Sequence, residues 1–443
     1  MPAGLMPTDT RRDALFSIVL LAFVAASQIG FMGYYDRSGF RSMPATLTLA
    51  LMMAAGIATF AILPRKFFVG LCRQWPLLLF AAWAVVTSLA SDYVDISLRR
   101  SALILVPGIL LAAGATADPW PDKTFQHVTI LLAGLAVASF AFSLISLAFG
   151  TVTAIGPVKY FIVHLWHGVD AGLMVGGRRI DLLRLELPRP SGLTGNPNSM
   201  ALLSMLALCM LWAKQIPRSS ITFSTRLLLA LLMASMLLTM SRAALIALIV
   251  FAAMLPILRY RSKDLSLLAL LLVLLAPVFI TFIVLAVMHG LVSPPPLYGS
   301  PEFLQNEGLS LGERLQIWGA ALSAMPAHLV AGLGFGVVQE ALYRPLKFAT
   351  TAQSTPFGIL LETGLPGLVL LFLVWLRPVR VALNGPDGGF LAKGIAAILL
   401  AIYVHQSVDN AVFRFHSLHF LFCYLIGAAA NPALAGLQPE PGK

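Results

Sequence analysis

The amino-acid sequence predicts an all-α polytopic membrane protein with about twelve membrane-spanning helices. Hydrophobic residues make up 58% of its 443 residues and charged residues only 11%, whereas a soluble globular chain carries about 25% charged residues. Its apolar stretches have the length of roughly 20 residues that a helix needs to cross a bilayer. They lack the alternating ten-residue segments of a membrane barrel, so the backbone hydrogen bonds must close within helices. We therefore expect residues 1–443 to form one integral membrane domain.

The predicted spans follow one another along the whole chain. The first follows Arg11 and Arg12 and resembles a signal sequence, but it has no obvious cleavage site, so we expect an uncleaved first helix. An apolar run at 227–258 is interpreted as two short helices hinged at Thr239–Arg242, because an arginine is costly in mid-membrane but tolerated at a helix end. The predicted spans are 14–33, 43–63, 75–90, 101–117, 127–149, 198–213, 227–240, 243–258, 265–289, 355–376, 392–408 and 417–432.

Short basic loops set the expected orientation. Lys and Arg gather in the loops 64–74, 214–226, 259–264 and 377–380, and such loops normally face the cytoplasm. Two long loops, at about 150–197 and 290–354, then lie on the periplasmic face. Loops of this length are usually functional or disordered, and the Trp, Phe and Leu residues within these two favour a function.

The first long loop carries arginines on the face where membrane proteins normally have few. Arg178, Arg179, Arg184 and Arg189 lie in GGRRIDLLRLELPRPSGLTGNPNS, residues 176–199. Arginine is always charged, and its planar fork binds phosphate oxygens in pairs. We interpret Arg189, beside a turn rich in Gly and Pro, as a phosphate ligand. The other three either contact lipid headgroups or complete a diphosphate clamp.

Other polar residues extend this candidate site. Asn198 is expected to cap the next helix, whose N-terminus favours anions. Arg242 is either a membrane-surface anchor or a further wall of the anion site. Arg314, in the helix-like patch 312–324, is a third possible contributor. The patch lies in the second long loop, ahead of the run GLGFG at 332–336.

Two acidic residues have structural interpretations that compete with functional ones. Glu362 lies one or two turns into a predicted span, where a carboxylate is expensive and usually paired. We expect it to pair with an arginine of the long loops. Asp409 lies at a helix end near His405 and Arg414, and Arg414 is its expected partner.

Charge and cysteine content exclude several classes of ligand. The net charge of +11 points to anionic headgroups or anionic lipid-linked substrates, and not to nucleic acid. The three cysteines are far apart and form no metal-binding or disulfide pattern. We therefore expect no metal and no other cofactor.

Several stretches, taken in this order, resemble the O-antigen ligase and O-antigen polymerase superfamily of bacterial envelopes. Each is moderately specific, but together they span most of the chain, and their order is hard to obtain by chance. The stretches are WAVVTSLASDYVDISLRR (83–100), RPSGLTGNPNSMA (189–201), LTMSRAALIALIV (238–250), ERLQIWGAAL with AGLGFG (313–336), LLETGLPGLVLL (360–371) and SVDNAVFR (407–414).

The resemblance implies a GT-C-like enzyme of the bacterial inner membrane that acts at the periplasmic face. It would take a glycan from an undecaprenyl-diphosphate donor, within a bilayer of membrane lipid. Ligases pass the glycan to lipid A-core, and polymerases pass it to another lipid-linked repeat unit. In this picture Arg189, with Arg178, Arg179 or Arg184, would hold the diphosphate and stabilise its charge as it leaves.

One position departs from the ligase pattern. Ligases usually carry a histidine about nine residues before the glutamate of the ETG motif, where this chain has Gln353 ahead of Glu362. Glutamine cannot act as a general base. The acceptor hydroxyl would need another base, such as His328, His405 or Glu340, or leaving-group stabilisation alone would drive the reaction. A single histidine is more often structural than catalytic.

The sequence therefore favours a metal-independent membrane glycosyltransferase, with a ligase slightly preferred to a polymerase. A transporter or flippase of an anionic lipid or glycan is the alternative from another class. It would require ionisable residues near mid-membrane and broken helices in two repeated halves, and the sequence shows neither clearly apart from Glu362. A non-catalytic partner in polysaccharide export is a third reading, which the missing histidine leaves open.

Overall fold

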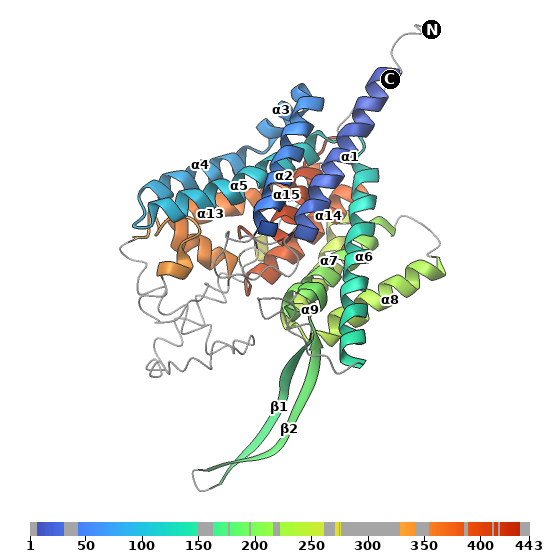
Figure 1. The fold of residues 1–443 in the computed structure, drawn as a ribbon, viewed down its shortest axis with the longest axis vertical. Helices are drawn as coiled ribbons and strands as arrows, with labels where there is room; N and C mark the ends of the chain where they lie inside the picture. The colour runs from blue at the N-terminus through green and yellow to red at the C-terminus, as the bar shows by residue number, and fades with distance from the viewer. Residues whose placement is uncertain are drawn as a thin grey trace.

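The structure is a computed structural model in which helices pack side by side into a bundle (Figure 1). It describes residues 7–30, 43–148, 163–175, 178–194, 196–215, 222–260, 271–273, 275, 328–341, 354–384, 389–409, 412–414 and 417–434.

The described helices correspond closely to the apolar runs of the sequence. They are α1 (Pro7–Gly30), α2 (Met43–Ile62), α3 (Pro64–Arg73), α4 (Trp75–Leu89), α5 (Val94–Ala117), α6 (Pro121–Ala148), α7 (Pro197–Gln215), α8 (Phe223–Leu238), α9 (Arg242–Tyr260), α13 (Thr355–Asn384), α14 (Phe390–Gln406) and α15 (Ser417–Ala429).

Every predicted span within the described residues coincides with a helix, which confirms the helical membrane class. Among these helices, five are long and apolar enough to cross a membrane, or six if the bent pair of α2 and α3 forms one span. The predicted span at 265–289 lies outside the described residues except for 271–273 and 275. The number of about twelve crossings therefore stays a prediction.

Two segments expected to be basic loops are helical instead. Residues 64–74 largely form α3, which bends by 113° from α2 and buries Phe67 and Gly70 against α5. Residues 377–380 lie within α13, which continues to Asn384. Both segments place their apolar residues at helical spacing, so one face packs while the basic residues stay at the other. A count of charges alone cannot reveal that arrangement.

The first long loop contains a β-hairpin, which an all-α prediction missed. Strand β1 (Val163–Val175) pairs antiparallel with β2 (Arg178–Pro190), and the hairpin extends away from the helices (Figure 1). A short 3-10 turn, Gly192–Thr194, then leads into α7. The expected helix-like patch at 312–324 in the second long loop lies outside the described residues.

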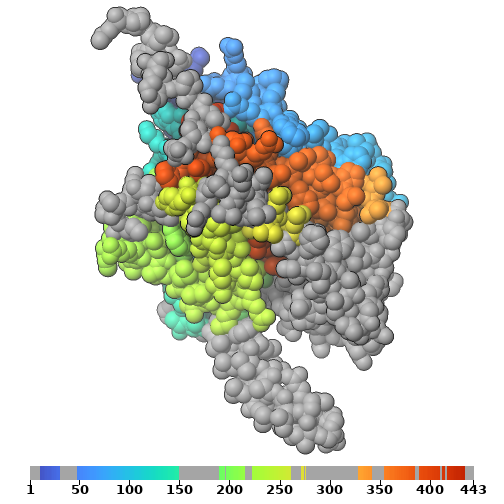
Figure 2. Space-filling model, turned by 180° about the vertical axis from the view of Figure 1, so that it is seen from behind, coloured from blue at the N-terminus to red at the C-terminus, as the bar shows by residue number. Residues whose placement is uncertain are grey.

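The C-terminal helices form the centre of the bundle. α14 and α15 are buried along almost their whole length, and α15 packs closely on α5, where a Cβ at Gly427 would collide with the carbonyl oxygen of Ala112. By contrast, α9 exposes Leu245, Ile246 and Ile249, and Figure 2 shows α9 on the outer surface of the molecule. Large apolar side chains at the rim and a closely packed centre are what a lipid-embedded bundle requires.

Candidate functional site

Arg189 is fixed at the base of the hairpin by two neutral oxygen atoms. Its Nε donates to the carbonyl oxygen of Thr239 at 2.7 Å, and its Nη2 donates to Oδ1 of Asn198 at 3.4 Å. Carbonyl and amide oxygens of this kind accept from a guanidinium group and so orient it. These bonds therefore join three residues from two of the sequence stretches singled out above, 189–201 and 238–250.

Thr239 lies in the break between α8 and α9, where the sequence predicted a hinge. Met240 takes the left-handed conformation with φ of 56°, and α9 begins at Arg242. Arg242 is exposed and is three residues from the carbonyl that holds Arg189. The α8–α9 turn thus carries Arg242 and also accepts the hydrogen bond of Arg189, and the shared anion site stays a prediction.

The sequence analysis expected Asn198 to cap α7. In the structure the cap is Asn196. The side-chain oxygen of Asn196 accepts from the backbone N–H groups of Asn198 at 2.8 Å and Ser199 at 3.3 Å. Pro197 occupies the first helical position, which its fixed φ favours, and this sets the cap one residue earlier. Asn198 instead orients Arg189. The Asn196 side chain thus occupies two of the N–H groups that this helix end could offer to an anion.

The hairpin separates the remaining arginines of the first loop from Arg189. Arg178 and Arg179 pair with Val175 and Met174 near the hairpin turn, while Arg189 pairs with His164 at the opposite end. Eleven residues of strand correspond to about 36 Å. The backbone positions of Arg178 and Arg179 are therefore far from Arg189 along the strands, and the expected diphosphate clamp stays a prediction. Arg184 lies partway along the strand, opposite Asp170.

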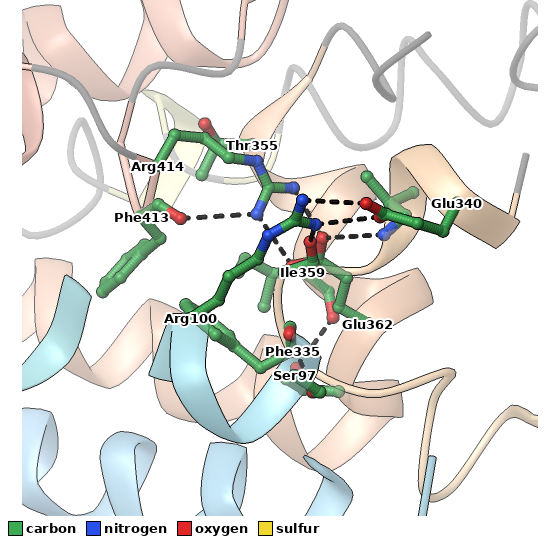
Figure 3. Close-up of polar contacts among 12 residues, drawn as sticks. Ser97, Arg100, Phe335, Glu340, Thr355, Ile359, Glu362, Phe413 and Arg414 are labelled. Carbon is green, nitrogen blue, oxygen red and sulfur yellow. Dashed lines mark hydrogen bonds and ion pairs between the residues drawn. The ribbon is translucent and has the colours of Figure 1, made fainter. Parts of the chain in front are cut away.

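A second group of charged residues, which we call the double ion-pair cluster, consists of Arg100, Glu340, Glu362 and Arg414. Arg100 binds both carboxylate oxygens of Glu340 at 2.8 Å. Arg414 binds both carboxylate oxygens of Glu362 at 2.8 and 2.9 Å. Figure 3 shows the two arginines pointing toward the two glutamates from different elements. The cluster contains two positive and two negative charges, so its formal net charge is zero.

Glu362 is fully buried, and Arg414 is its partner, whereas the sequence analysis had assigned Arg414 to Asp409. The backbone N–H of Val338 also donates to the Glu362 carboxylate, at 3.3 Å. A buried carboxylate is tolerated only with such compensation. Asp409 lies 3.9 Å from Nδ1 of His405, and its carbonyl accepts from the N–H of Thr355 at the start of α13.

The glycine-rich run 332–336 compensates a break in α13. Gly364 has φ of 69°, which interrupts the helix directly after Glu362. The carbonyl of Leu361 accepts from Leu333 N–H at 2.8 Å, and that of Glu362 accepts from Gly334 N–H at 2.9 Å. These bonds satisfy carbonyls that lose their helical partners at the break.

The indole of Trp83 completes this arrangement. Its Nε1 donates to the carbonyl of Thr363 at 2.7 Å. On the other side of the turn, the hydroxyl groups of Ser91 and Ser97 donate to the carbonyls of Leu333 and Phe335 at 2.5 and 2.8 Å. The serines and Trp83 come from the stretch 83–100. The stretches 83–100, 313–336 and 360–371, which the sequence analysis singled out separately, therefore contact one another here.

Arg100 was missed as a site residue, although it ends the stretch 83–100. Its guanidinium also donates to the carbonyl of Gly336, and its side chain is about one-fifth exposed. The predicted span began at residue 101, whereas α5 begins at Val94 and includes Arg100, so the sequence did not show that this arginine needs a partner within the bundle. That partner is 240 residues away, which no local pattern could identify.

The other expected site residues have different outcomes. His328 is partly buried and its carbonyl accepts from Gly332 N–H, so it begins the glycine-rich turn. Arg314 and Gln353 lie outside the described residues. Among the described residues, no three His, Cys, Asp or Glu side chains gather as metal ligands would.

Comparison with known proteins gives one finding at the level of a family. Residues 227–372 match the family model described as O-antigen ligase, which is about a third of the chain. No curated protein matches the sequence. The matched segment contains the α8–α9 turn, the glycine-rich run and Glu362. It confirms the resemblance to the O-antigen ligase superfamily and supports a ligase- or polymerase-like membrane enzyme.

Proposed function

We propose, from its place in the O-antigen ligase superfamily, that this chain transfers a glycan from undecaprenyl diphosphate to an acceptor at the periplasmic face of the bacterial inner membrane. The acceptor is lipid A-core or a similar glycan, as in a ligase. In the reaction the anomeric C–O bond to the diphosphate breaks, and a bond to the acceptor oxygen forms. The acceptor hydroxyl loses its proton, and undecaprenyl diphosphate leaves as an anion.

The observation that carries this proposal is the position of Arg189, which is bonded to the turn that precedes Arg242. The bonds to Thr239 and Asn198 hold the Arg189 guanidinium before any ligand arrives. A donor that is already oriented toward developing negative charge lowers the barrier without further reorganisation. Loss of one such donor typically reduces kcat by about 100- to 1,000-fold. Arg189 and Arg242 are the diphosphate ligands of this proposal.

The proton of the acceptor hydroxyl needs a base, and His328 is the residue that we propose for this role. It lies at the start of the turn that buries Glu362, and it is partly buried. Glu340 is less suitable, because both of its oxygens already bind Arg100. Replacement of His328 by Ala should lower transfer without altering the amount of donor bound.

The decisive experiment measures glycan transfer in membranes that contain Arg189→Lys or Arg189→Ala at matched protein levels. We expect both variants to lose most activity, because lysine keeps the charge but lacks the fork that binds Thr239 and Asn198. Arg226→Gln is the matched control, because Arg226 is exposed at the opposite end of α8. Normal transfer by Arg189→Ala would disprove the proposed role.

A polymerase of the same superfamily would use the same donor site with a lipid-linked repeat unit as acceptor. The two activities differ in the cell. A deletion strain that loses glycan-capped lipid A-core identifies a ligase, and one that accumulates single repeat units identifies a polymerase.

The break in α13 beside a buried carboxylate is the observation that favours a transporter. The partner of Glu362 argues against it. Arg414 binds both oxygens of Glu362, so this charge is fixed within the protein and not presented to a transported ion.

A further inference from the structure

Two buried cations meet at the end of the bundle opposite Arg242. Arg259, which the sequence analysis placed in a loop, lies in the last turn of α9 and is only 7% exposed. Its Nη2 donates to the carbonyl oxygens of Ala213 at 2.8 Å and Phe390 at 3.2 Å. Its Nε and Nη1 are buried and have no hydrogen-bond partner among the residues that the structure describes. Buried donors of this kind are rare in proteins and call for an acceptor.

Lys393 contributes the second charge from the first turn of α14. Phe390, Lys393 and Gly394 are spaced to share one helix face, and a Cβ at Gly394 would lie 3.2 Å from Nη2 of Arg259. Lys393 is 9% exposed. In the part of the chain that the structure describes, the ion pairs involve other residues, and no carboxylate pairs with Arg259 or Lys393.

The N-terminus of α14 adds a third positive contribution. Its cap residue, Gly389, provides no side-chain acceptor for the first N–H groups. The helix has 17 residues, long enough for its aligned peptide dipoles to favour a negative group at this end. The C-terminal turns of α7 and α9 lie near this end and carry partial negative charge. Arg259 offsets part of that charge, because it donates to the Ala213 carbonyl of α7.

We propose that Arg259, Lys393 and the first turn of α14 form a binding site for a phosphate group. The site takes the headgroup of an anionic lipid. Arg259 and Arg242 are 17 residues apart on one helix, or about 25 Å, which is close to the thickness of the hydrocarbon core. The site therefore faces the leaflet opposite the Arg189 turn, and it stands independently of the proposed transferase activity.

The surroundings of the site favour a lipid over free phosphate as the source of that group. Tyr260 is 67% exposed, and its ring lies 6.5 Å from that of Phe390, beside the Arg259 guanidinium. Aromatic residues of this kind gather where the bilayer meets water. Farther along α9 the exposed residues are apolar, so acyl chains can cover this helix while the phosphate reaches the cations.

The test uses the full chain purified in an uncharged detergent. Phosphatidylglycerol, phosphatidylcholine or inorganic phosphate is titrated in turn, and both the midpoint of thermal unfolding and the lipid retained in native mass spectrometry are measured. Arg259→Gln and Lys393→Gln each remove one cation. Arg226→Gln is the matched control, because it removes an exposed charge at the same end of the bundle.

We expect phosphatidylglycerol to raise the unfolding midpoint of the wild type and of Arg226→Gln. Either site variant should need about tenfold more lipid to reach half of the full rise in the unfolding midpoint. This is the change expected from the loss of one charge-assisted hydrogen bond. The lipid-dependent shift is the readout, because a purely structural Arg259 would change only the starting midpoint. If Arg259→Gln fails to fold, Lys393→Gln decides the question. An equal response in all proteins would overturn the site, and a full response to inorganic phosphate would keep the phosphate chemistry but overturn its assignment to a lipid.

Discussion

Removing either partner of the Glu362–Arg414 pair should destabilise the protein by clearly different amounts. Arg414→Gln leaves Glu362 fully buried and, among the described residues, with one backbone donor, at 3.3 Å. Breaking a buried pair in this way costs about 3–5 kcal/mol. Glu362→Gln instead leaves Arg414, whose side chain is 20% exposed and can recover part of its hydration. We expect a smaller cost there, about 1–3 kcal/mol.

The double variant Glu362→Gln/Arg414→Gln separates the ion pair from other effects of each substitution. It carries no unpaired charge, so its cost should fall well below the sum of the two single costs, by roughly 2 kcal/mol. The assay is denaturant unfolding in detergent micelles followed by tryptophan fluorescence. Trp83, which donates to the neighbouring Thr363 carbonyl, lies close enough to report on this region.

Lys66→Gln is the control, because it removes an ion pair that is exposed and not buried. Lys66 and Asp13 are 3.2 Å apart, with the lysine side chain 54% exposed. Exposed pairs contribute little to stability, so the unfolding midpoint should hardly change. The reasoning fails if Glu362→Gln proves as costly as Arg414→Gln, or if the two single effects simply add.

Three further outcomes test other features. Gly364→Ala should destabilise the protein in the same unfolding assay by about 1–3 kcal/mol, because φ is 69° and the new Cβ would collide with the Val330 carbonyl; an unchanged midpoint would contradict the break in α13. Burial raises the pKa of Asp118, although Ser17 and the Trp120 N–H donate to it. The folded state then binds the proton more tightly, so stability should fall as pH rises from the ordinary carboxyl pKa through the raised one. Asp118→Asn keeps an acceptor oxygen but cannot ionise, so its stability should not show this fall with pH. Parallel profiles of unfolding stability against pH for the variant and the wild type would refute this. Glycan transfer should survive EDTA, and a loss reversed by added metal would disprove metal independence.

The positions of the helices could be predicted because membrane helices must be apolar along their length. The hinge at Thr239–Arg242 was also predictable, since an arginine in mid-membrane is costly. The misses have local causes. α3 mixes basic and apolar residues and resembles a loop when only its charge is considered. The cap of α7 moved from Asn198 to Asn196 because Pro197 prefers the first helical position.

The candidate site was only partly predictable, because its partners are distant in sequence. Arg189 could be singled out from its loop, but its bond to the Thr239 carbonyl depends on how α7 and α8 pack. Glu362 was expected to pair with an arginine of the long loops, and Arg414 was assigned to Asp409. The actual partner of Glu362, Arg414, lies 52 residues later. Tertiary packing, and not any motif, decides between such alternatives.

The long separation between Glu362 and Arg414 has a consequence for biosynthesis. A nascent chain that ends before residue 407 would already contain the broken helix and its acidic group, but not the guanidinium that compensates it. Insertion of α13 would then leave an unneutralised carboxylate in lipid, a state that quality-control proteases can recognise. Premature termination between the end of α13 and Arg414 should therefore yield a short-lived fragment, even though most of the bundle has been made.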